Sequence, residues 1–173
     1  MLFRSTYEVK GYNQVNENLA LFINMPTDTR RFAPVYDTVT VWGGHLALGY
    51  QPTNELELSL GTDYRSFSPL RQAKAWHLPN FEGNLGAKYH FSKAFETHLL
   101  AFTAIGASAL DEKLKTIALP AMFDVNVGAS YHISDNFGLF LDINNVLNQK
   151  YQRWNNYQSY GFNLIGGITL KFK

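Results

Sequence analysis

The side chains able to do chemistry in this 173-residue chain are carboxylates, histidines and serines, because cysteine is absent. Glu55 and Glu57 are two positions apart, which in a β-strand places both carboxylates on one face about 7 Å apart. A retaining glycosidase needs about 5 Å between its two carboxylates. Ser130 and His132 have the same spacing, but no nucleophile-elbow or oxyanion motif surrounds them. The sequence therefore predicts that the chain is not an enzyme.

The five histidines lie far apart in the sequence and form no His-x-x-x-His pair of the kind that binds zinc. They are His45, His77, His90, His98 and His132. We expect no metal and no cofactor. The net charge is +1, so the composition gives no reason to expect a nucleic-acid partner.

The elements that carry these residues alternate between apolar and polar side chains with a period of two. Such alternation predicts β-strands, because successive Cβ atoms point to opposite faces of a sheet. The last strand shows it best, with Leu164, Ile168 and Leu170 on one face and Asn163 and Thr169 on the other. Strands are expected at 3–12 with a continuation at 19–25, and at 36–50, 55–65, 81–90, 95–109, 123–132, 137–144 and 159–173. The count is eight if 3–25 is one interrupted strand and nine if it is two.

Short and long connections alternate along the chain. Turns of about four residues follow Tyr50, His90 and His132. Longer loops are expected at 26–34, 67–79, 110–120 and 145–157. All the short turns therefore lie at one end of an antiparallel meander, together with the C-terminus.

Two kinds of barrel, one soluble and one in a membrane, would explain this alternation. In a soluble lipocalin-like binding barrel the apolar face points inward, whereas in an outer-membrane barrel it points outward to lipid. The strand lengths, the alternating connections and the aromatic residues at strand ends favour the membrane barrel. The polar face then lines the lumen, and its predicted row is Glu55, Glu57, Asp63, Arg65, Glu82, Lys88, Asp124, Asn126 and Asp142.

The sequence contains no run of about 18 apolar residues that could form a membrane helix. It starts without a basic segment followed by an apolar one, so a secretory signal is not expected here. Residues 1–173 are expected to form a single β-barrel segment without a plug domain. Three loop aromatics, Trp76, Trp154 and Tyr157, are predicted to anchor at the interface or to contact a ligand.

The closing segments Asp142–Trp154 and Tyr160–Phe172 resemble the end of TonB-dependent outer-membrane receptors, in particular those of the Bacteroidota. The shared features are an Asn-apolar-Leu-Asn-x-x-Tyr run and then a Gly-Phe-Asn strand with a terminal aromatic residue. The resemblance implies a location in the bacterial outer membrane and a part in energised uptake of a nutrient ligand. It also implies that outer-membrane lipid and the barrel assembly machinery are partners, with Phe162, Leu170 and Phe172 forming the C-terminal assembly signal.

This chain departs from the family in length, because such receptors have about twenty-two strands and an N-terminal plug. A TonB box is not visible either, so TonB is a partner only if a plug domain exists elsewhere. We therefore expect either the C-terminal part of a receptor barrel or a small standalone outer-membrane barrel. The standalone form would have a structural, adhesion or lipid-modifying role, and the soluble binding barrel is the remaining alternative.

Overall fold

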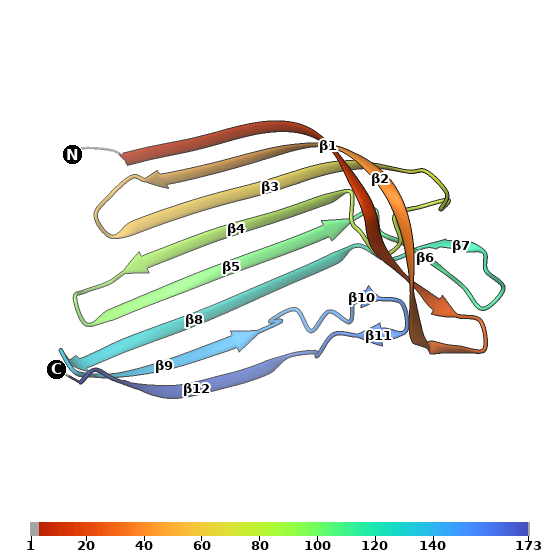
Figure 1. Cartoon of the computed structure of the whole chain (residues 1–173). Coiled ribbons are helices and arrows are strands. Elements are labelled where there is room, and N and C mark those ends of the chain that lie inside the picture. Colours follow the sequence, from red (N-terminus) through yellow and green to blue (C-terminus); the bar gives the residue numbers. More distant parts are fainter. Residues whose placement is uncertain (1–3, 173) are drawn as a thin grey trace.

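The computed structural model describes residues 4–172, which fold into an all-β structure (Figure 1). Eight strands form one antiparallel sheet in the order β1-β2-β3-β4-β5-β8-β9-β12, which confirms the predicted meander. They are β1 (Arg4–Met25), β2 (Asp28–Gln51), β3 (Leu56–Pro69), β4 (Phe81–His90), β5 (Phe95–Ile105), β8 (Met122–Ser134), β9 (Phe137–Asn144) and β12 (Asn163–Leu170). The turns after β2, β4 and β8, the start of β1 and the end of β12 lie at one end of the sheet, as expected. The tight turn between Met25 and Asp28 was not predicted and lies at the opposite end, with the long loops.

Two small hairpins in the long connections were not predicted from the sequence. They are β6 (Ser108–Leu110) with β7 (Thr116–Ala118), and β10 (Gln152–Trp154) with β11 (Tyr157–Gln158). The prediction of one strand over 95–109 is wrong at its end, because β5 stops at Ile105. Gly106 then adopts a φ of 87° and turns the chain into β6.

The predicted loop at 26–34 is also wrong, since β2 already begins at Asp28. β1 is one strand whose register shifts between Asn16 and Leu19, so the sheet has eight strands and not nine. β3 pairs with β2 only from Val39 onward, which leaves the outer parts of β1 and β2 as a two-stranded ribbon. A proline such as Pro34 is tolerated there, because an edge strand need not donate every N–H.

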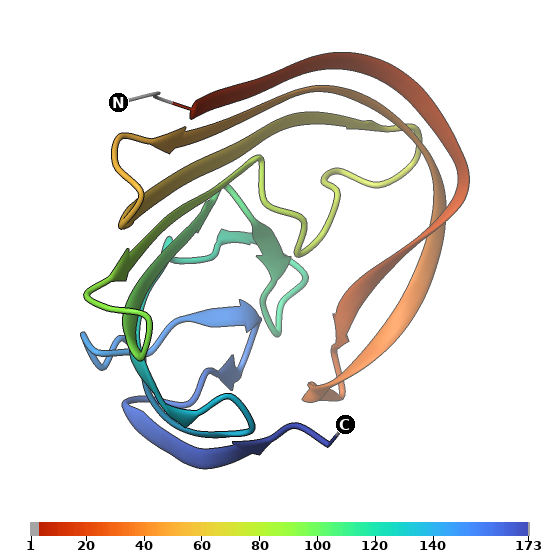
Figure 2. The same ribbon diagram turned by 90° about the vertical axis from the view of Figure 1, so that its left-hand side faces the viewer.

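The sheet is curved into an open trough, and β1 and β12 form its two margins (Figure 2). The ribbon of β1 and β2 bends over the trough, and the long loops lie in the hollow. No helix among the described residues is long and apolar enough to cross a membrane.

The largest apolar core lies on the concave side, between the ribbon and the loops. Leu21, Val39 and Val41 pack there against Trp76 and Leu110, and all five are buried. Val39 and Val41 share a strand face with Gly43 and His45, because all are odd-numbered positions of β2. The polar face of the sheet is therefore the concave one.

Asp37 anchors the β3–β4 loop to the ribbon. Its carboxylate accepts backbone N–H bonds from Thr38 at 2.8 Å, Arg71 at 2.9 Å and Gln72 at 2.7 Å. Burial alone would raise the pKa of Asp37, but these three donors outweigh it and lower the pKa below its ordinary value. The loop that carries Trp76 is thereby held against β2.

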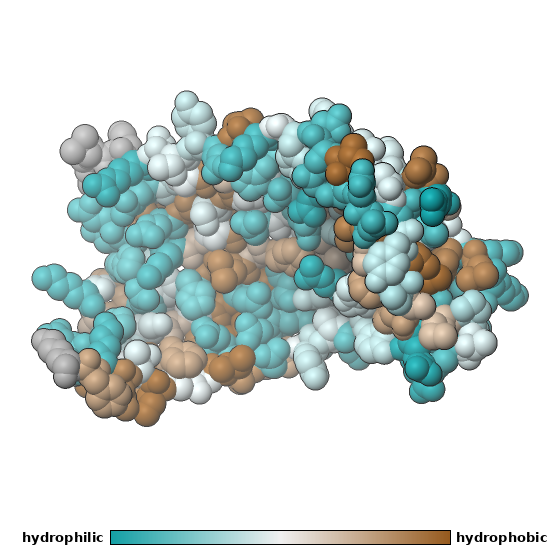
Figure 3. Space-filling view, in the orientation of Figure 1, coloured by the Kyte–Doolittle hydropathy of each residue, from teal (hydrophilic) through white to brown (hydrophobic). Residues whose placement is uncertain are grey.

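The convex face is apolar and exposed. Leu85, at the middle of β4, is 47% exposed, and Leu48, Leu141 and Ile168 are exposed in the same way. Aromatic residues form two rows across this face: Trp42, Tyr64, Phe81 and Phe123 near the loop end, and Tyr50, Tyr89, Phe95, Tyr131 and Phe137 near the turn end. The opposite side, seen in Figure 3, carries many hydrophilic residues over the strands and hydrophobic ones among the loops.

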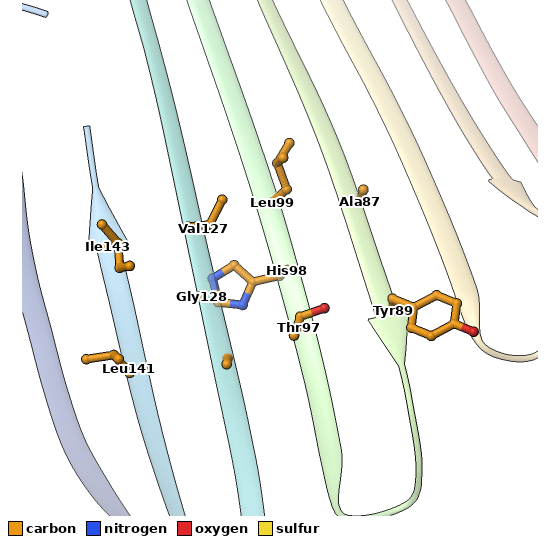
Figure 4. Close-up of a pocket in the computed structure, with 10 residues that line it drawn as sticks. Ala87, Tyr89, Thr97, His98, Leu99, Val127, Gly128, Leu141 and Ile143 are labelled. Carbon is orange, nitrogen blue, oxygen red and sulfur yellow. The ribbon is translucent and has the colours of Figure 1, made fainter. Parts of the chain in front are cut away.

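A shallow groove of about 400 Å³ runs over the convex face of β4, β5, β8 and β9 (Figure 4). Small side chains at Ala87, Thr97 and Ala129 form its floor, with Leu99 and Ile143 among its larger neighbours. The groove is lined mainly by apolar side chains, together with Tyr89, Thr97 and His98.

Candidate functional site

Charged side chains on the concave face pair across neighbouring strands. Asp63 Oδ1 of β3 lies 3.0 Å from His45 Nδ1 of β2. Arg65 Nη2 of β3 donates to Glu82 Oε2 of β4 at 2.6 Å. Both pairs follow from the register, which places these residues opposite or diagonal to one another.

A second charged group lies on the concave face near the turn end. Lys88 Nζ is 3.0 Å from Glu96 Oε2, which is also 3.2 Å from His90 Nδ1. Glu57 approaches His90 Nε2 at 3.8 Å. Glu55, also predicted for this row, lies in the turn just before β3 and is exposed.

Asp142 reaches a partner two strands away. Its Oδ1 lies 3.3 Å from Nε2 of His98, although β8 runs between the two strands. Gly128 of β8 makes this possible, because a Cβ there would collide with both side chains. Figure 4 shows the imidazole of His98 lying beside Gly128.

Asp124 and Asn126 of β8 hold the last long loop instead of facing an open channel. Tyr151 Oη donates to Asp124 Oδ2 at 2.7 Å, and burial together with this bond raises the pKa of Tyr151 to about 12. The backbone N–H of Asn145 donates to Asn126 Oδ1 at 2.9 Å. These two residues of the predicted polar row are therefore structural contacts of the loop.

Backbone geometry explains the two asparagines of the Asn-apolar-Leu-Asn run, Asn145–Asn148. Asn145 and Asn148 have φ values of 49° and 51°, a region that asparagine tolerates better than other residues with a side chain. Asn145 is buried, donates to the carbonyls of Gln149 and Tyr160, and accepts from the N–H of Gln149. Asn148 Oδ1 accepts from the N–H of Phe162 at 3.0 Å. The motif thus fixes the entry and exit of the loop.

An aromatic cluster lies at the loop end, where three distant segments meet. Trp154 of β10 contacts Phe22 of β1, Phe32 of β2 and His77 of the β3–β4 loop, with ring centroids 5.6, 5.5 and 5.0 Å away. Tyr157 of β11 lies 5.5 Å from Phe32. We call these five residues the loop-end cluster. Only Trp154 and Tyr157 were predicted as ligand-contacting or interfacial aromatic residues, because contacts between segments far apart in the sequence leave no local signal.

His77 is the titratable member of the loop-end cluster and is 4% exposed. Its Nδ1 lies 2.9 Å from the carbonyl oxygen of Phe22, so this nitrogen carries the proton. Burial lowers the pKa of His77, and the bond to the carbonyl only partly offsets this. Nε2 is buried and has no hydrogen-bond partner among the described residues.

Trp76 does not belong to this cluster. It is 3% exposed in the concave core, and its Nε1 donates to Gln72 Oε1 at 3.0 Å. The expectation of an interfacial or ligand-contacting aromatic residue at Trp76 is therefore wrong. A tryptophan in a loop gives no sequence signal of whether the loop turns inward.

The remaining candidate residues from the sequence do not come together in a site within the described structure. Phe162, Leu170 and Phe172 are exposed at or beyond the ends of β12. Ser130 and His132 share a face of β8 without a hydrogen bond between them in the described part of the chain. Within residues 4–172 no three His, Asp or Glu side chains are grouped to hold a metal ion.

Comparison with known proteins identifies the fold. No family model and no curated protein sequence matches this chain. Among solved structures, it is similar to the siderophore receptor PiuA from Acinetobacter baumannii, with a TM-score of 0.71 and 17% identity over 97% of this chain and 26% of that one.

Two further structures give the same result. The ferripyoverdine receptor of the outer membrane of Pseudomonas aeruginosa has a TM-score of 0.72 and 16% identity, over 98% of this chain and 25% of the receptor. The FrpB iron transporter from Neisseria meningitidis has a TM-score of 0.68 and 19% identity, over 98% and 29%. The chain thus has the fold of one part of an outer-membrane receptor barrel and spans less than a third of those chains.

Proposed function

We propose that this chain forms part of the wall of a TonB-dependent outer-membrane receptor that takes up a nutrient ligand. The observation that carries the proposal is the apolar convex face bounded by two aromatic rows. Phe81 and Tyr89 mark the two rows on β4, eight residues or about 27 Å apart along the strand. Outer-membrane barrels present an apolar band about 25 Å tall between aromatic girdles.

The distribution of polar and apolar side chains over the two faces of the sheet supports contact between the convex face and lipid. A soluble binding barrel keeps its apolar face inward, but here His45, Asp63, Arg65 and Glu82 lie on the concave face. In the proposed orientation the convex band contacts outer-membrane lipid and the charged pairs face the lumen. The turns after β2, β4 and β8 then face the periplasm, and the loop-end cluster and the turn between β1 and β2 face the outside.

The open margins support a larger barrel over a standalone one. β1 and β12 each pair on one side only, and β1 is 22 residues long. An unpaired strand of that length inside a membrane would leave its N–H and C=O groups unsatisfied. We therefore propose that further strands of the same receptor pair with both margins, and that a plug elsewhere in the protein couples to TonB.

We propose that the wall is a non-enzymatic element, which the barrel assembly machinery builds into the outer membrane. Phe162, Leu170 and Phe172 supply the signal that this machinery recognises. We propose a receptor of the Bacteroidota type because the last long loop carries the Asn-apolar-Leu-Asn-x-x-Tyr motif at Asn145–Tyr151.

Lipid-dependent folding tests the orientation. Leu85→Lys places a charge at the middle of the convex band and should cost about 2–4 kcal/mol of folding free energy in phospholipid vesicles. Asn84→Lys is the matched control, because Asn84 is an exposed neighbour on the concave face. Urea titrations followed by circular dichroism measure both variants. Equal losses, or complete folding of the chain in plain buffer, would refute the proposal.

A further inference from the structure

The groove on the convex face arises from small side chains between larger ones. Thr97 of β5 and Ala129 of β8 lie directly opposite each other, and Tyr89 of β4 and Leu141 of β9 continue the same row on either side (Figure 4). The hollow between them has a volume of about 400 Å³, which lies within the range of small-molecule sites. An elongated apolar group therefore fits there.

A series of aromatic rings borders the groove on the side of the turns. The ring centroids of Tyr89 and Phe91 are 4.6 Å apart, those of Phe91 and Phe95 5.3 Å, and those of Phe95 and Tyr131 6.5 Å. Phe91 belongs to the turn after β4 and is 61% exposed. Aromatic residues at the end of an apolar band lie at the level of the lipid headgroups. The groove thus begins just inside that level.

The groove lies within the depth of one lipid leaflet. Thr97 and Leu99 are two and four residues from Phe95, or about 7 and 13 Å along the strand. Half of the hydrocarbon core of a bilayer is about 15 Å thick. In the orientation proposed above, the groove therefore lies among the acyl chains of the periplasmic leaflet.

A basic side chain lies at the headgroup level beside the groove. Lys93 is exposed in the turn between β4 and β5, two residues before Phe95, and makes no ion pair within 4.0 Å among residues 4–172. It lines a second hollow at the turn end with Lys171 and Asp135, so two basic groups face one acid there. The carboxylate of Glu96 is already paired with a lysine and a histidine. Lys93 is thus available to an anionic headgroup.

We propose that this groove binds an acyl chain of an anionic phospholipid of the periplasmic leaflet, and that Lys93 binds the phosphate of its headgroup. The acyl chain lies over Thr97 and Ala129, between Tyr89 and Leu141. Ordinary contact between the apolar band and lipid does not depend on headgroup charge, whereas this site selects for it. The inference rests on the proposed wall function and adds a specific lipid site to it.

The probe is dioleoyl phosphatidylglycerol, titrated into the full chain folded in detergent micelles, with bound lipid counted by native mass spectrometry. We expect it to bind about fivefold more tightly than dioleoyl phosphatidylcholine, which has the same acyl chains but no net charge. Lys93→Gln should remove this preference. Lys113→Gln, an equal charge change in the β6–β7 loop, should keep it.

Filling the groove tests the position of the acyl chain. Ala129→Phe and Thr97→Leu place larger side chains on its floor from two different strands. Each should weaken binding of phosphatidylglycerol about tenfold, because excluding about two methylene groups from an apolar site corresponds to such a factor. Ala101→Phe is the matched control, since Ala101 lies on the same face of β5 but outside the groove, and binding should be unchanged.

Circular dichroism of each variant shows whether it folds, and all three groove and control substitutions place an apolar side chain on the face that contacts lipid. The inference is overturned if the two lipids bind equally well to the wild-type chain, if both groove-filling variants bind phosphatidylglycerol as the wild type does, or if Ala101→Phe weakens binding as much as they do. Because lipid-dependent folding is measured separately with Leu85→Lys, each of these results leaves the wall function standing.

Discussion

Asn155 donates its side-chain amide to Oδ1 of Asn24 at 3.3 Å, and Asn24 donates its own amide to the backbone carbonyl of Asn155 at the same distance. The two residues are 131 positions apart, and both are buried. The first hairpin of the chain is thus joined to its last loop. This contact closes the ribbon over the trough and places Phe22 beside Trp154.

Asn155→Ala should release the ribbon from the loop. The donations of the Asn155 amide to Asn24 Oδ1 and to the carbonyl of Leu110 would both be lost, whereas the bond from the Asn24 amide to the backbone carbonyl of residue 155 could remain. We expect the closed arrangement to be destabilised by about 1–3 kcal/mol. Limited proteolysis in micelles should cut residues 22–32 faster, whereas Asn54→Ala, at the turn end, should not change the rate. An unchanged cleavage rate in Asn155→Ala would show that the contact does not hold the ribbon.

The closed arrangement should depend on pH through His77. Its pKa is lowered by burial, so the open state binds a proton more readily than the closed state. Closure is therefore complete above the ordinary pKa of about 6.5 and weakens as the pH falls through that value towards the lower pKa of the closed state. The measurement is proteolysis of residues 22–32 between pH 8 and pH 5.

His77→Gln is the control for this titration. Glutamine keeps an N–H for the carbonyl of Phe22 but does not titrate, so the pH dependence should disappear. His45, His90 and His98 lie on the concave face, away from the contact between the ribbon and the last loop, and each is beside a carboxylate. If the pH dependence survives in His77→Gln, the assignment to His77 is wrong.

Gly128 should be intolerant of any side chain. A Cβ there would collide with Asp142 and His98, so Gly128→Ala should cost about 1–3 kcal/mol through overpacking and loss of their contact. Gly166→Ala is the matched control, because a Cβ there meets its nearest atoms at 3.6 Å. Urea unfolding in vesicles compares the two variants. Equal stability would mean that the His98–Asp142 contact rearranges freely.

Asn145 should be replaceable neither by alanine nor by glycine, but for different reasons. Alanine loses the side-chain hydrogen bonds and is strained at a φ of 49°, so we expect a loss of about 2–4 kcal/mol. Glycine loses the bonds without the strain and should cost about 1–3 kcal/mol. Val146→Ala, an exposed neighbour, should be nearly neutral. Unfolding free energies in the order Gly below Ala would contradict the backbone argument.

The sheet could be predicted from the sequence because its pattern is local. Alternation at 55–65, 81–90 and 137–144 depends only on the two-residue period of a strand, and each of these strands is present within a few residues of the expected bounds. The loop at 26–34 was wrong because its strand character comes from pairing with β1. Nothing in the local composition signals that pairing.

The site was less predictable. Trp154 and Tyr157 are conspicuous in the sequence, but Phe22, Phe32 and His77 join them only when the ribbon bends over the trough. Trp76 packs in the concave core, and Asp124 and Asn126 accept hydrogen bonds from the last long loop. Contacts between distant segments decide each of these cases.

The sequence by itself determined the eight strands of the main sheet, the short turns after β2, β4 and β8 and the two contrasting faces of each strand, because these follow from the two-residue repeat and from turn chemistry. Only the tertiary structure decided which face is concave, that β1 and β12 remain unpaired at the margins, and that an aromatic cavity forms at the loop end. The cavity arises from packing between Phe22 and Phe32 of the ribbon and Trp154 and Tyr157 of the last loop, more than a hundred positions away. Such packing depends on the whole sheet and not on any one segment of it.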